Sequence, residues 1–460
     1  MKIARTYYLC LAAIFLMALI LRLSLAITFQ GLSSPPSYSA QPDQIEYEQL
    51  AYHLSTGGGY TTPSGRPTAH RPPGTSFVLL PLYVVFGRSF AAGRIFFCLL
   101  SAATCLATAW LARQCYGTGV ALVSAAWLAL YPGHFYHSMH FESEVPYGLF
   151  LTLACGLTLY SFRSKGGVGG ADVVAGVFWG LAVLTRPQII FVLPLAWVLV
   201  VFSTHSFRSR DVLRLTIHTC ALLCVLAPWV VRNAVVVGKP TLSTVGAYTF
   251  WGAHNDVVLH DSRLRGSWVR TSDFVDDQHP ITGTEVEREA AMWKYGFEFV
   301  KHHLSQMPQF VAMKLWRLVS PFANTPNRPV FWAFALGWLV TGPPALVGVV
   351  SVFRDRRPIP AVLLAPVFAT LVTTIIFYGS DRFRDSISPI FVILATRAAV
   401  NWGRAWFPSF DSELGCVRSE IAVWTNSPPS YLLVPRQAGD PHSGLDRASS
   451  AAHNCKRWKA

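Results

Sequence analysis

The sequence predicts an all-α integral membrane protein with about ten transmembrane helices. Apolar residues make up 52% of its 460 residues, charged residues only 13%, and the mean hydropathy is +0.37. So few charges would leave the surface of a soluble protein of this length poorly solvated. Apolar windows of the roughly 20 residues that a spanning helix needs recur along the chain. The predicted spans are 7–28, 92–112, 118–137, 145–162, 172–187, 188–203, 213–233, 329–352, 359–379 and 387–402.

Lysines and arginines between these spans predict the orientation of the chain. They are enriched in alternate connections, and short loops rich in these residues stay in the cytoplasm. Both termini are therefore predicted to be cytoplasmic, which agrees with the even number of spans. The segments predicted to face outward are 29–91, 138–144, 234–328 and 380–386.

Charge and cysteine usage exclude two further classes of protein. The formal net charge of +14 does not indicate a nucleic-acid partner, because the charge lies in short inner loops and at span ends, and no basic patch is interleaved with aromatic residues. None of the nine cysteines falls in a predicted outer loop, so no external disulfide framework is expected. Residues 1–402 form the predicted membrane domain, and the polar stretch 403–460 is predicted to be a disordered cytoplasmic tail.

The first outer loop, 29–91, begins with a candidate active-site helix. Asp43, Glu46 and Tyr47 fall on one face at helical spacing, which predicts a short amphipathic helix at the membrane surface. Asp43 would lie in its first turn, where the helix dipole stabilises a carboxylate. Two interpretations of Asp43 stay open, an acid that stabilises the helix and an acid that takes part in chemistry.

The same loop continues with a basic and proline-rich turn. His70 and Arg71 precede two prolines, which hold the backbone extended and present the guanidinium in a fixed direction. At lipid headgroup depth such a guanidinium suits a phosphate, and an interfacial anchor is the alternative. Residues 76–87 are apolar but too short to span comfortably, which predicts a surface-lying or re-entrant helix.

The second outer connection is rich in histidine and glutamate. His134, His137 and His140 recur every third residue, next to Glu142 and Glu144. These residue types suggest a metal, but the spacing is not a strong zinc signature, and no metal ligand is predicted. Glu144 lies at the outer end of a predicted span, where an acid without a role is costly to bury, and is therefore a site candidate.

Arginines recur at the outer boundaries of the later spans. Arg186 lies in a Thr-Arg-Pro turn, and Arg232 ends the motif PWVVRN, where it is either an anchor or a ligand. Arg382 and Arg384 alternate with aspartates in the last outer turn and suit a phosphate group. The long outer segment, 234–328, is expected to bind the acceptor or to cover the cleft, and helices are predicted over 284–303 and 307–320.

The placement of ionisable residues favours an enzyme over a transporter. Few charges occur within the predicted spans, whereas a secondary transporter more often places ionisable groups at the bilayer midplane. An outer acid surrounded by cations at headgroup depth predicts an enzyme that acts on a lipid phosphate. A transporter or flippase of a lipid-linked glycan is the alternative, and a non-catalytic scaffold is the third hypothesis.

A set of short motifs resembles the polytopic GT-C glycosyltransferases of the family 39-like group. The branch most similar is that of the protein O-mannosyltransferases and the lipid A aminoarabinose transferase, and the resemblance covers roughly residues 7–402. The motifs are Asp43 with Glu46 and Tyr47, GGGY (57–60), RPPG (71–74), FESEVPYGLF (141–150), GLAVLTRP (180–187), PWVVRN (228–233) and DRFRDSISP (381–389).

The resemblance implies an inverting hexosyl- or pentosyltransferase that uses a polyprenyl-phosphate-linked sugar. Asp43 would orient or deprotonate the acceptor hydroxyl, with Glu144 as a second acid in the cleft. Arg71, Arg382 and Arg384, with His70, would contact the donor phosphate.

The resemblance also implies a cellular location, while the acceptor and any metal requirement stay open. It implies a multi-pass protein of the cell (inner or plasma) membrane whose active site faces the periplasm or the exterior. Gln44 replaces the glutamate of the mannosyltransferase Asp-Glu pair, so the acceptor stays open between a glycolipid, a glycan and a protein of the cell envelope. No cofactor is certain, and the participation of a divalent cation is also open.

Overall fold

The structure is a computed structural model, and all of its elements are helices within the residues that it describes. Contacts divide the chain into two units, Met1–Gly403 and Arg404–Ala460. The predicted cytoplasmic tail lies outside the described residues from residue 407 onward and stays a prediction. The described residues are 2–37, 43–164, 167–194, 197, 209–276, 279–322, 327–354 and 362–406.

The long helices carry the apolar sequence that predicted a membrane protein, and the all-α membrane fold is confirmed. Five helical segments are long and apolar enough to cross a membrane: Ala4–Gln30, Phe90–Tyr116, Glu144–Arg163, Ser209–Val236 and Arg328–Val352. The corresponding elements are α1 (Lys2–Leu25) with η1 (Ala26–Gln30), α4 (Phe90–Tyr116), α7 (Glu144–Arg163), α10 (Ser209–Val236) and α15 (Arg328–Arg354).

The count of about ten spans is not confirmed, because several predicted spans are short helices. The predicted span 118–137 contains a helix of only 13 residues, α5 (Thr118–Leu130), which Gly117 and the Tyr131-Pro132 step bound. At 1.5 Å per residue such a helix is roughly 20 Å long, against a hydrocarbon core of about 30 Å. Half of the predicted span 188–203 lies outside the described residues. The other apolar elements are α3 (Gly74–Phe86), α8 (Gly170–Thr185), η3 (Pro187–Val192), α16 (Leu364–Ile376) and α18 (Ser388–Trp406).

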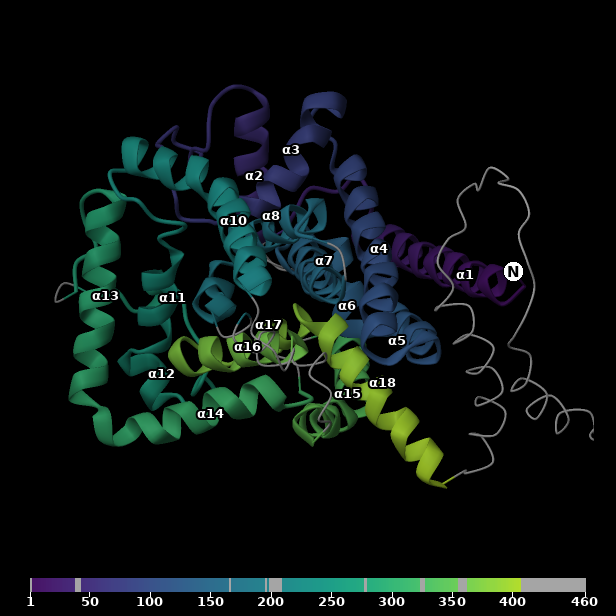
Figure 1. Ribbon diagram of the computed structural model, residues 1–460. Helices are drawn as coiled ribbons and strands as arrows, with labels where there is room; N and C mark the ends of the chain where they lie inside the picture. The colour runs from purple at the N-terminus through teal and green to yellow at the C-terminus, as the bar shows by residue number, and fades with distance from the viewer. Residues whose placement is uncertain are drawn as a thin grey trace, which may run out of the picture. The chain divides into compact units, whose positions relative to one another are not determined.

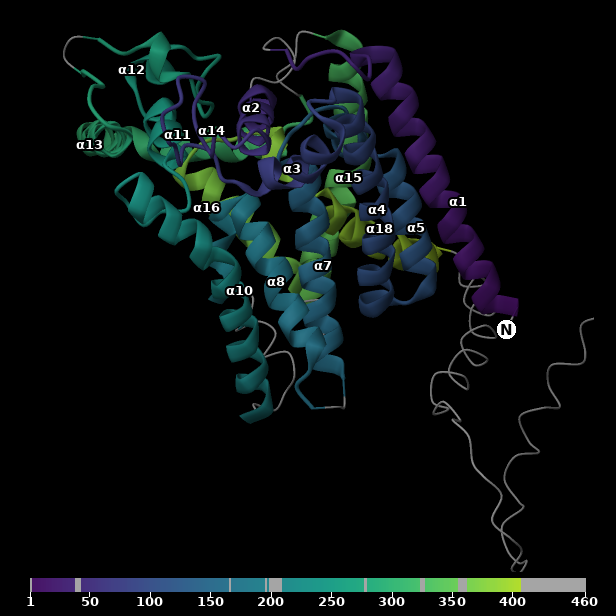
Figure 2. The ribbon, with the colours of Figure 1, turned by 90° about the horizontal axis from the view of Figure 1, so that it is seen from above.

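Short helices gather at one end of the long ones. In Figures 1 and 2, α2, α11, α12 and α13 lie at the same end of α7, α8 and α10, and α13 is seen end-on in Figure 2 and so runs across them. These helices come from the two segments predicted to face outward, the first loop and residues 234–328. The bounds of these helices and of the remaining short ones are α2 (Asp43–Ser55), α6 (Pro132–Phe135), η2 (Tyr136–Met139), α11 (Val245–Ala253), α12 (Asp256–His260), η4 (Thr271–Asp273), α13 (Glu285–His302), η5 (Leu304–Gln306), α14 (Met307–Val319) and α17 (Asp381–Asp385).

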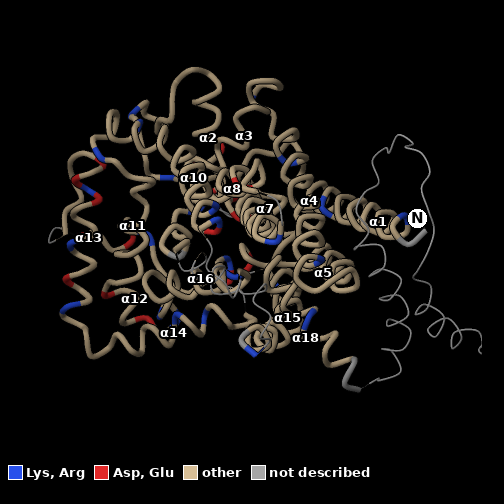
Figure 3. The backbone as a smooth tube through the Cα atoms, viewed as in Figure 1, with Lys and Arg blue, Asp and Glu red and all other residues tan. Residues whose placement is uncertain are grey.

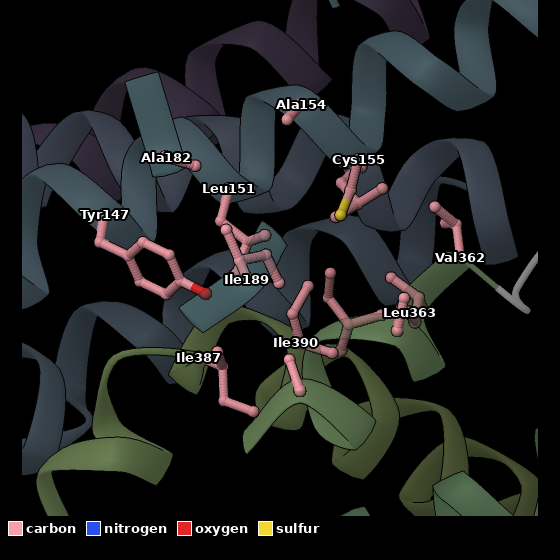
Figure 4. Packing of buried hydrophobic residues seen from close by; sticks show 14 of the residues in the cluster. Tyr147, Leu151, Ala154, Cys155, Ala182, Ile189, Val362, Leu363, Ile387 and Ile390 are labelled. Carbon is pink, nitrogen blue, oxygen red and sulfur yellow. The ribbon is translucent and has the colours of Figure 1, made fainter. Parts of the chain in front are cut away.

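The main core fixes α7 and α8 against the C-terminal helices. Figure 4 shows Leu151 of α7, Ile189 of η3 and Ile390 of α18 pointing toward one another, and each is at most 1% exposed. On the other side of α8, a Cβ atom at Gly176 would overlap the backbone of α10, so this glycine permits the close approach of the two helices. The core therefore holds the N-terminus of α7 and the C-terminus of α8 in fixed positions at the end where the short helices gather.

Candidate active site

Asp43, the first residue of α2, is held between two arginines from distant parts of the chain. Arg71 Nη2 donates to its Oδ1 at 2.8 Å, and Arg382 Nη1 donates to its Oδ2 at 3.0 Å. Burial alone would raise the pKa of Asp43, but Arg71 and Arg382 outweigh it and lower the pKa to about 2. The carboxylate is therefore ionised at neutral pH, and its side chain is still 21% exposed.

Arg71 is oriented by the face of α2 that the sequence predicted. Its Nε donates to Glu46 Oε2 at 2.7 Å, and the ring of Tyr47 lies 5.7 Å from its guanidinium carbon. Both contacts follow from helical spacing, because residues three and four positions after Asp43 share its face. Tyr47 is buried and Arg71 is 14% exposed, so one side of the guanidinium stays accessible.

Arg382 connects the remaining acids to Asp43. Its Nε donates to Glu144 Oε1 at 2.7 Å, and its Nη2 lies 3.3 Å from Glu142 Oε1. Arg186 Nη2 lies 2.6 Å from Glu144 Oε1 on the other side. Four acids and three arginines thus form one charged cluster, consisting of Asp43, Glu46, Arg71, Glu142, Glu144, Arg186 and Arg382.

The turns that carry Arg71 and Arg186 touch through their backbones. Gly74 is the first residue of α3, and Thr185 is the last of α8. A Cβ atom at Gly74 would overlap the backbone of Thr185. The glycine of the RPPG motif is therefore required for the close approach of these two turns.

Three residues beside the cluster, Tyr131, His137 and Asp385, were not predicted to be site residues. His137 Nδ1 donates to Glu142 Oε2 at 2.6 Å, and Tyr131 donates to Asp385 Oδ1 at 3.0 Å. His137 Nε2 lies 3.8 Å from Asp385 Oδ2. Burial would lower the pKa of His137, but Asp385 and Glu142 raise it to about 10. The position of Glu142 two residues before Glu144 was the available signal in the sequence. The contacts with Asp385 join segments about 250 residues apart, for which the sequence carried no signal.

Three of these groups are close enough to hold a metal ion. One ligand atom each of His137, Glu142 and Glu144 lies within 4.8 Å of the others, and all three residues are buried. The other two histidines of the run 134–140 do not join them. His134 lies against Ser101, its Nε2 3.2 Å from the hydroxyl, and His140 packs on the ring of Tyr136.

Three predicted phosphate or site residues make no hydrogen bond or ion pair with the charged cluster among the described residues. Arg232 donates to the backbone carbonyls of Thr68 and Tyr60 at 2.7 and 2.8 Å. Arg384 is 1% exposed and donates to carbonyls at the end of α14. The imidazole of His70 lies beside the ring of Tyr248, with 5.6 Å between ring centres.

A pocket of about 1070 Å³ ends at the charged cluster. Arg382 and His137 line its polar end, and Phe29, Trp316 and Phe334 belong to its apolar walls, which η1, α14 and α15 supply. Figure 3 shows few charged residues along the long helices and a group of them between α8 and α16. The site thus joins fixed charges to an apolar space.

Known proteins match this chain in sequence over one region and in fold over most of its length. A family model described as dolichyl-phosphate-mannose-protein mannosyltransferase matches residues 70–231. This range contains His70, Arg71, Glu144 and Arg186, and the match confirms the resemblance predicted from the sequence over these residues. No curated protein sequence matches the chain.

Solved structures show the fold. The apo oligosaccharyltransferase of Archaeoglobus fulgidus superposes with a TM-score of 0.52 at 13% identity, covering 92% of this chain and 53% of that protein. The oligosaccharyltransferase AglB from the same organism, in complex with an inhibitory peptide and a dolichol-phosphate, gives 0.48 at 13% identity, covering 89% and 54%. Apo ArnT from Cupriavidus metallidurans gives 0.41 at 14% identity, covering 88% and 80%. The chain spans about half the length of the oligosaccharyltransferase structures.

Proposed function

We propose that this protein is a membrane glycosyltransferase that moves a sugar from a polyprenyl-phosphate donor to an acceptor in the cell envelope. The observation that carries the proposal is the Asp43 carboxylate held by Arg71 and Arg382, of which Arg382 also lines a pocket with apolar walls. The match to a mannosyltransferase family whose description names a dolichyl-phosphate donor supports it. The acceptor is a glycolipid, a glycan or a protein, and the sugar is a hexose or a pentose.

The two arginines suit the phosphate of the donor. Guanidinium groups bind phosphate oxygens through pairs of parallel hydrogen bonds. Arg71 and Arg382 are 14% and 24% exposed and converge on one point, the Asp43 carboxylate. The apolar walls of the adjoining pocket suit the isoprenoid chain that would anchor this phosphate.

The transfer step needs a base, and Asp43 is placed to be that base. The acceptor oxygen attacks the anomeric carbon as Asp43 takes the hydroxyl proton. The bond from that carbon to the phosphate oxygen breaks, and the phosphate leaves with the electron pair, inverting the configuration. Arg71 and Arg382 stabilise the negative charge that grows on the phosphate.

Donor binding would also activate the base. With a pKa of about 2, Asp43 is a weak base while both arginines bind it. A donor phosphate competes for the same guanidinium groups, and loss of their charge-assisted hydrogen bonds raises the pKa of the carboxylate. Asp43 thereby becomes a stronger base only once the donor is in place.

A divalent cation fits the residues beside this site. Two carboxylates and an imidazole are ligands that zinc or manganese accepts, and His137, Glu142 and Glu144 supply them. With its pKa raised to about 10, His137 is an imidazolium at neutral pH, so a cation would bind there in exchange for a proton of His137. A bound cation would add positive charge near the leaving phosphate, which Arg382 also supplies.

The apolar helices and the fold make this a multi-pass membrane protein, and we place its site on the periplasmic or extracellular face of the cell membrane. This placement follows from the alternate enrichment of lysine and arginine in the inner loops. Labelling of single cysteines at Thr62 and Gly167 with an impermeant thiol reagent in intact cells tests it. Labelling at Thr62 and not at Gly167 is expected, and the reverse would contradict it.

A transfer assay tests the proposed function. The purified protein in lipid receives a panel of radiolabelled polyprenyl-phosphate sugars and membrane extract, and wild type is compared with Asp43→Asn and with Asp261→Asn. Asp261 is an exposed-loop acid paired with Arg263 and serves as a matched control. Label transferred by wild type and Asp261→Asn but not by Asp43→Asn supports the proposal. Equal translocation of a labelled lipid-linked glycan by all three proteins in vesicles, without transfer, would favour a flippase.

A further inference from the structure

Glu285, the first residue of α13, reaches out of the long outer segment into the first outer loop. Its Oε2 accepts from the Thr68 hydroxyl at 2.6 Å, and its Oε1 accepts from the Ala69 amide at 2.9 Å. Oε1 also accepts from the hydroxyl of Thr244 at 2.8 Å. One carboxylate therefore holds the backbone two and three residues before Arg71.

The backbone around that contact is also fixed. The three carbonyls of residues 68–70 accept, in order, from Arg232 Nη1 at 2.7 Å, from the Thr244 amide at 3.0 Å and from the Ser243 hydroxyl at 2.5 Å. The carbonyl of Arg71 accepts from the Tyr60 hydroxyl at 3.0 Å. Because two prolines follow Arg71, the backbone has little freedom on either side of it.

Lys314 makes the corresponding contact to the segment that carries Arg382. It lies in α14, is 1% exposed, and donates from Nζ to the Ile375 carbonyl at 3.2 Å and to His254 Nε2 at 2.9 Å. His254 Nε2 is the acceptor because Nδ1, 2.7 Å from the Phe250 carbonyl, carries the proton. The ammonium thus joins α11 and α14 to the last turn of α16.

The chain between α16 and Arg382 is bound to the same segment. The Gly379 amide donates to the Gly266 carbonyl at 2.8 Å. A Cβ atom at Gly379 would overlap the carbonyl oxygen of Lys314. Arg384, two residues after Arg382, donates to carbonyls at the end of α14.

We propose that the outer frame, defined as residues 243–276 and 279–320, holds Arg71 and Arg382 at the separation that phosphate binding requires. Glu285 and Lys314 are its positioning residues, the first acting on Arg71 and the second on Arg382. This rests on the proposed function in that both arginines bind the donor phosphate. The frame differs from the expected role of this segment in acceptor binding or in covering the cleft.

A double-mutant cycle on phosphate binding tests the frame. Binding of radiolabelled undecaprenyl phosphate to the full chain in nanodiscs is measured for wild type, Glu285→Ala, Arg71→Lys and the double variant. Arg71→Lys keeps the charge but loses the paired hydrogen bonds. Because Glu285 acts through Arg71, its loss should weaken binding about tenfold in the wild-type background and less than about threefold beside Arg71→Lys.

A second double-mutant cycle tests the contact between Lys314 and the segment that carries Arg382. Lys314→Met removes the ammonium and keeps much of the side-chain volume, and we expect its effect on binding to shrink in the same way beside Arg382→Lys. Glu289→Ala is the matched control for Glu285→Ala. Glu289 lies one turn further along α13, is buried, and pairs with Lys239 at 2.7 Å rather than with the first outer loop. Its loss should leave undecaprenyl phosphate affinity within about twofold of wild type.

A measurement without ligand separates failure of the frame from failure of the proposed function. In hydrogen exchange, the peptide over residues 60–76 should exchange faster in Glu285→Ala than in Glu289→Ala. Equal exchange in the two, or additive effects in both cycles, would overturn the frame. If neither arginine variant alters undecaprenyl phosphate binding while exchange changes as expected, the phosphate-binding role fails and the frame stands. If Glu285→Ala does not fold, Glu285→Gln is used in its place, because the amide keeps one acceptor oxygen.

Discussion

Two clusters of acids and bases lie at opposite ends of α7 and α8, and their surroundings differ. At the end where the short helices gather, Asp43, Arg71 and Arg382 are 14–24% exposed and adjoin the pocket that Arg382 lines. At the other end, Asp172, with Arg214 Nε at 3.8 Å and His218 Nε2 at 3.5 Å, forms a cluster whose three side chains are at most 3% exposed.

The comparison shows that exposure, rather than residue type, separates a site from a structural contact here. Asp172 also accepts from the Ser161 hydroxyl and from the Gly169 amide, so its carboxylate ties the end of α7 to the start of α8. No substrate can reach these partners without separating the helices. At the outer end a substrate phosphate can take over hydrogen bonds that the arginines now donate to acids.

The largest expected effect is that of Asp43→Asn. The amide keeps the shape but cannot accept the acceptor proton, so we expect the transfer rate to fall by about 10³-fold. The thermal midpoint of unfolding should fall only modestly, since the ion pairs with Arg71 and Arg382 that lower the pKa of Asp43 to about 2 also stabilise the folded state. Retention of more than about a tenth of the rate would remove Asp43 from its role as base.

Arg382→Gln is expected to have the next largest effect. Loss of one charge-assisted contact to the leaving phosphate typically costs about 10²-fold in rate, and this arginine also bonds Glu144. The rate should fall while undecaprenyl phosphate binding weakens less, because the contact strengthens as charge develops. Steady-state kinetics over a range of donor concentrations measure both.

Lys314 differs from the charged residues of both clusters, because in the described part of the chain this buried cation makes no ion pair with an acid. Burial lowers its pKa from 10.5 to about 7. Above pH 7 the folded protein releases this proton while the unfolded chain keeps it to about pH 10.5, so stability rises with pH over that interval. We expect a gain of about 2 kcal/mol between about pH 7.5 and about pH 9 in the free energy of unfolding.

Lys314→Met is the control for this pH dependence. Methionine has no proton to release, so the rise in stability between the two pH values should largely disappear. Thermal or denaturant unfolding in one detergent at each pH gives the comparison. An unchanged slope would show that another group titrates.

Asp172→Asn should reverse the pattern of Asp43→Asn. Removing the buried charge weakens the contacts of Asp172 with Ser161, Gly169 and Arg214 and should lower the free energy of unfolding by about 1–3 kcal/mol. The activity of the folded fraction should stay within about twofold of wild type. A specific loss of transfer at full stability would break the distinction between the two clusters.

Chelation is expected to have the smallest effect. His137, Glu142 and Glu144 can hold a divalent cation, but Arg382 already places positive charge beside both acids. Treatment with EDTA should therefore lower transfer by less than about threefold, and Zn²⁺ or Mn²⁺ should restore it. Complete loss on chelation would make the metal, rather than the arginines, the main source of charge stabilisation.

The sequence predicted much of the fold and the residues that meet at Asp43. Helical spacing placed Glu46 and Tyr47 beside Asp43, and the structure brings Arg71 and Arg382 to that carboxylate. The number of spans was harder to predict from the sequence, because a continuous apolar stretch does not show that a helix ends partway through it.

Contacts between residues of distant segments could not be predicted from the sequence. Arg232 and Arg384 resemble Arg71 and Arg382 as boundary arginines, yet they donate to backbone carbonyls. Periodicity specifies the face on which a side chain lies, but not which of several loops packs against that face. The same reason applies to Glu285, whose only sequence signal was its place at the start of an amphipathic helix.

The ion pairs at Asp43 also bear on how the site tells its donor from soluble anions. To bind, a free phosphate ion must displace the Asp43 carboxylate from Arg71 and Arg382. It can do so only to the extent that its concentration in the surrounding solution allows. A phosphate attached to an isoprenoid chain is confined to the membrane beside the site, where its effective concentration is far higher. Anchorage would thus favour the lipid over an identical soluble headgroup without any added contact to the phosphate.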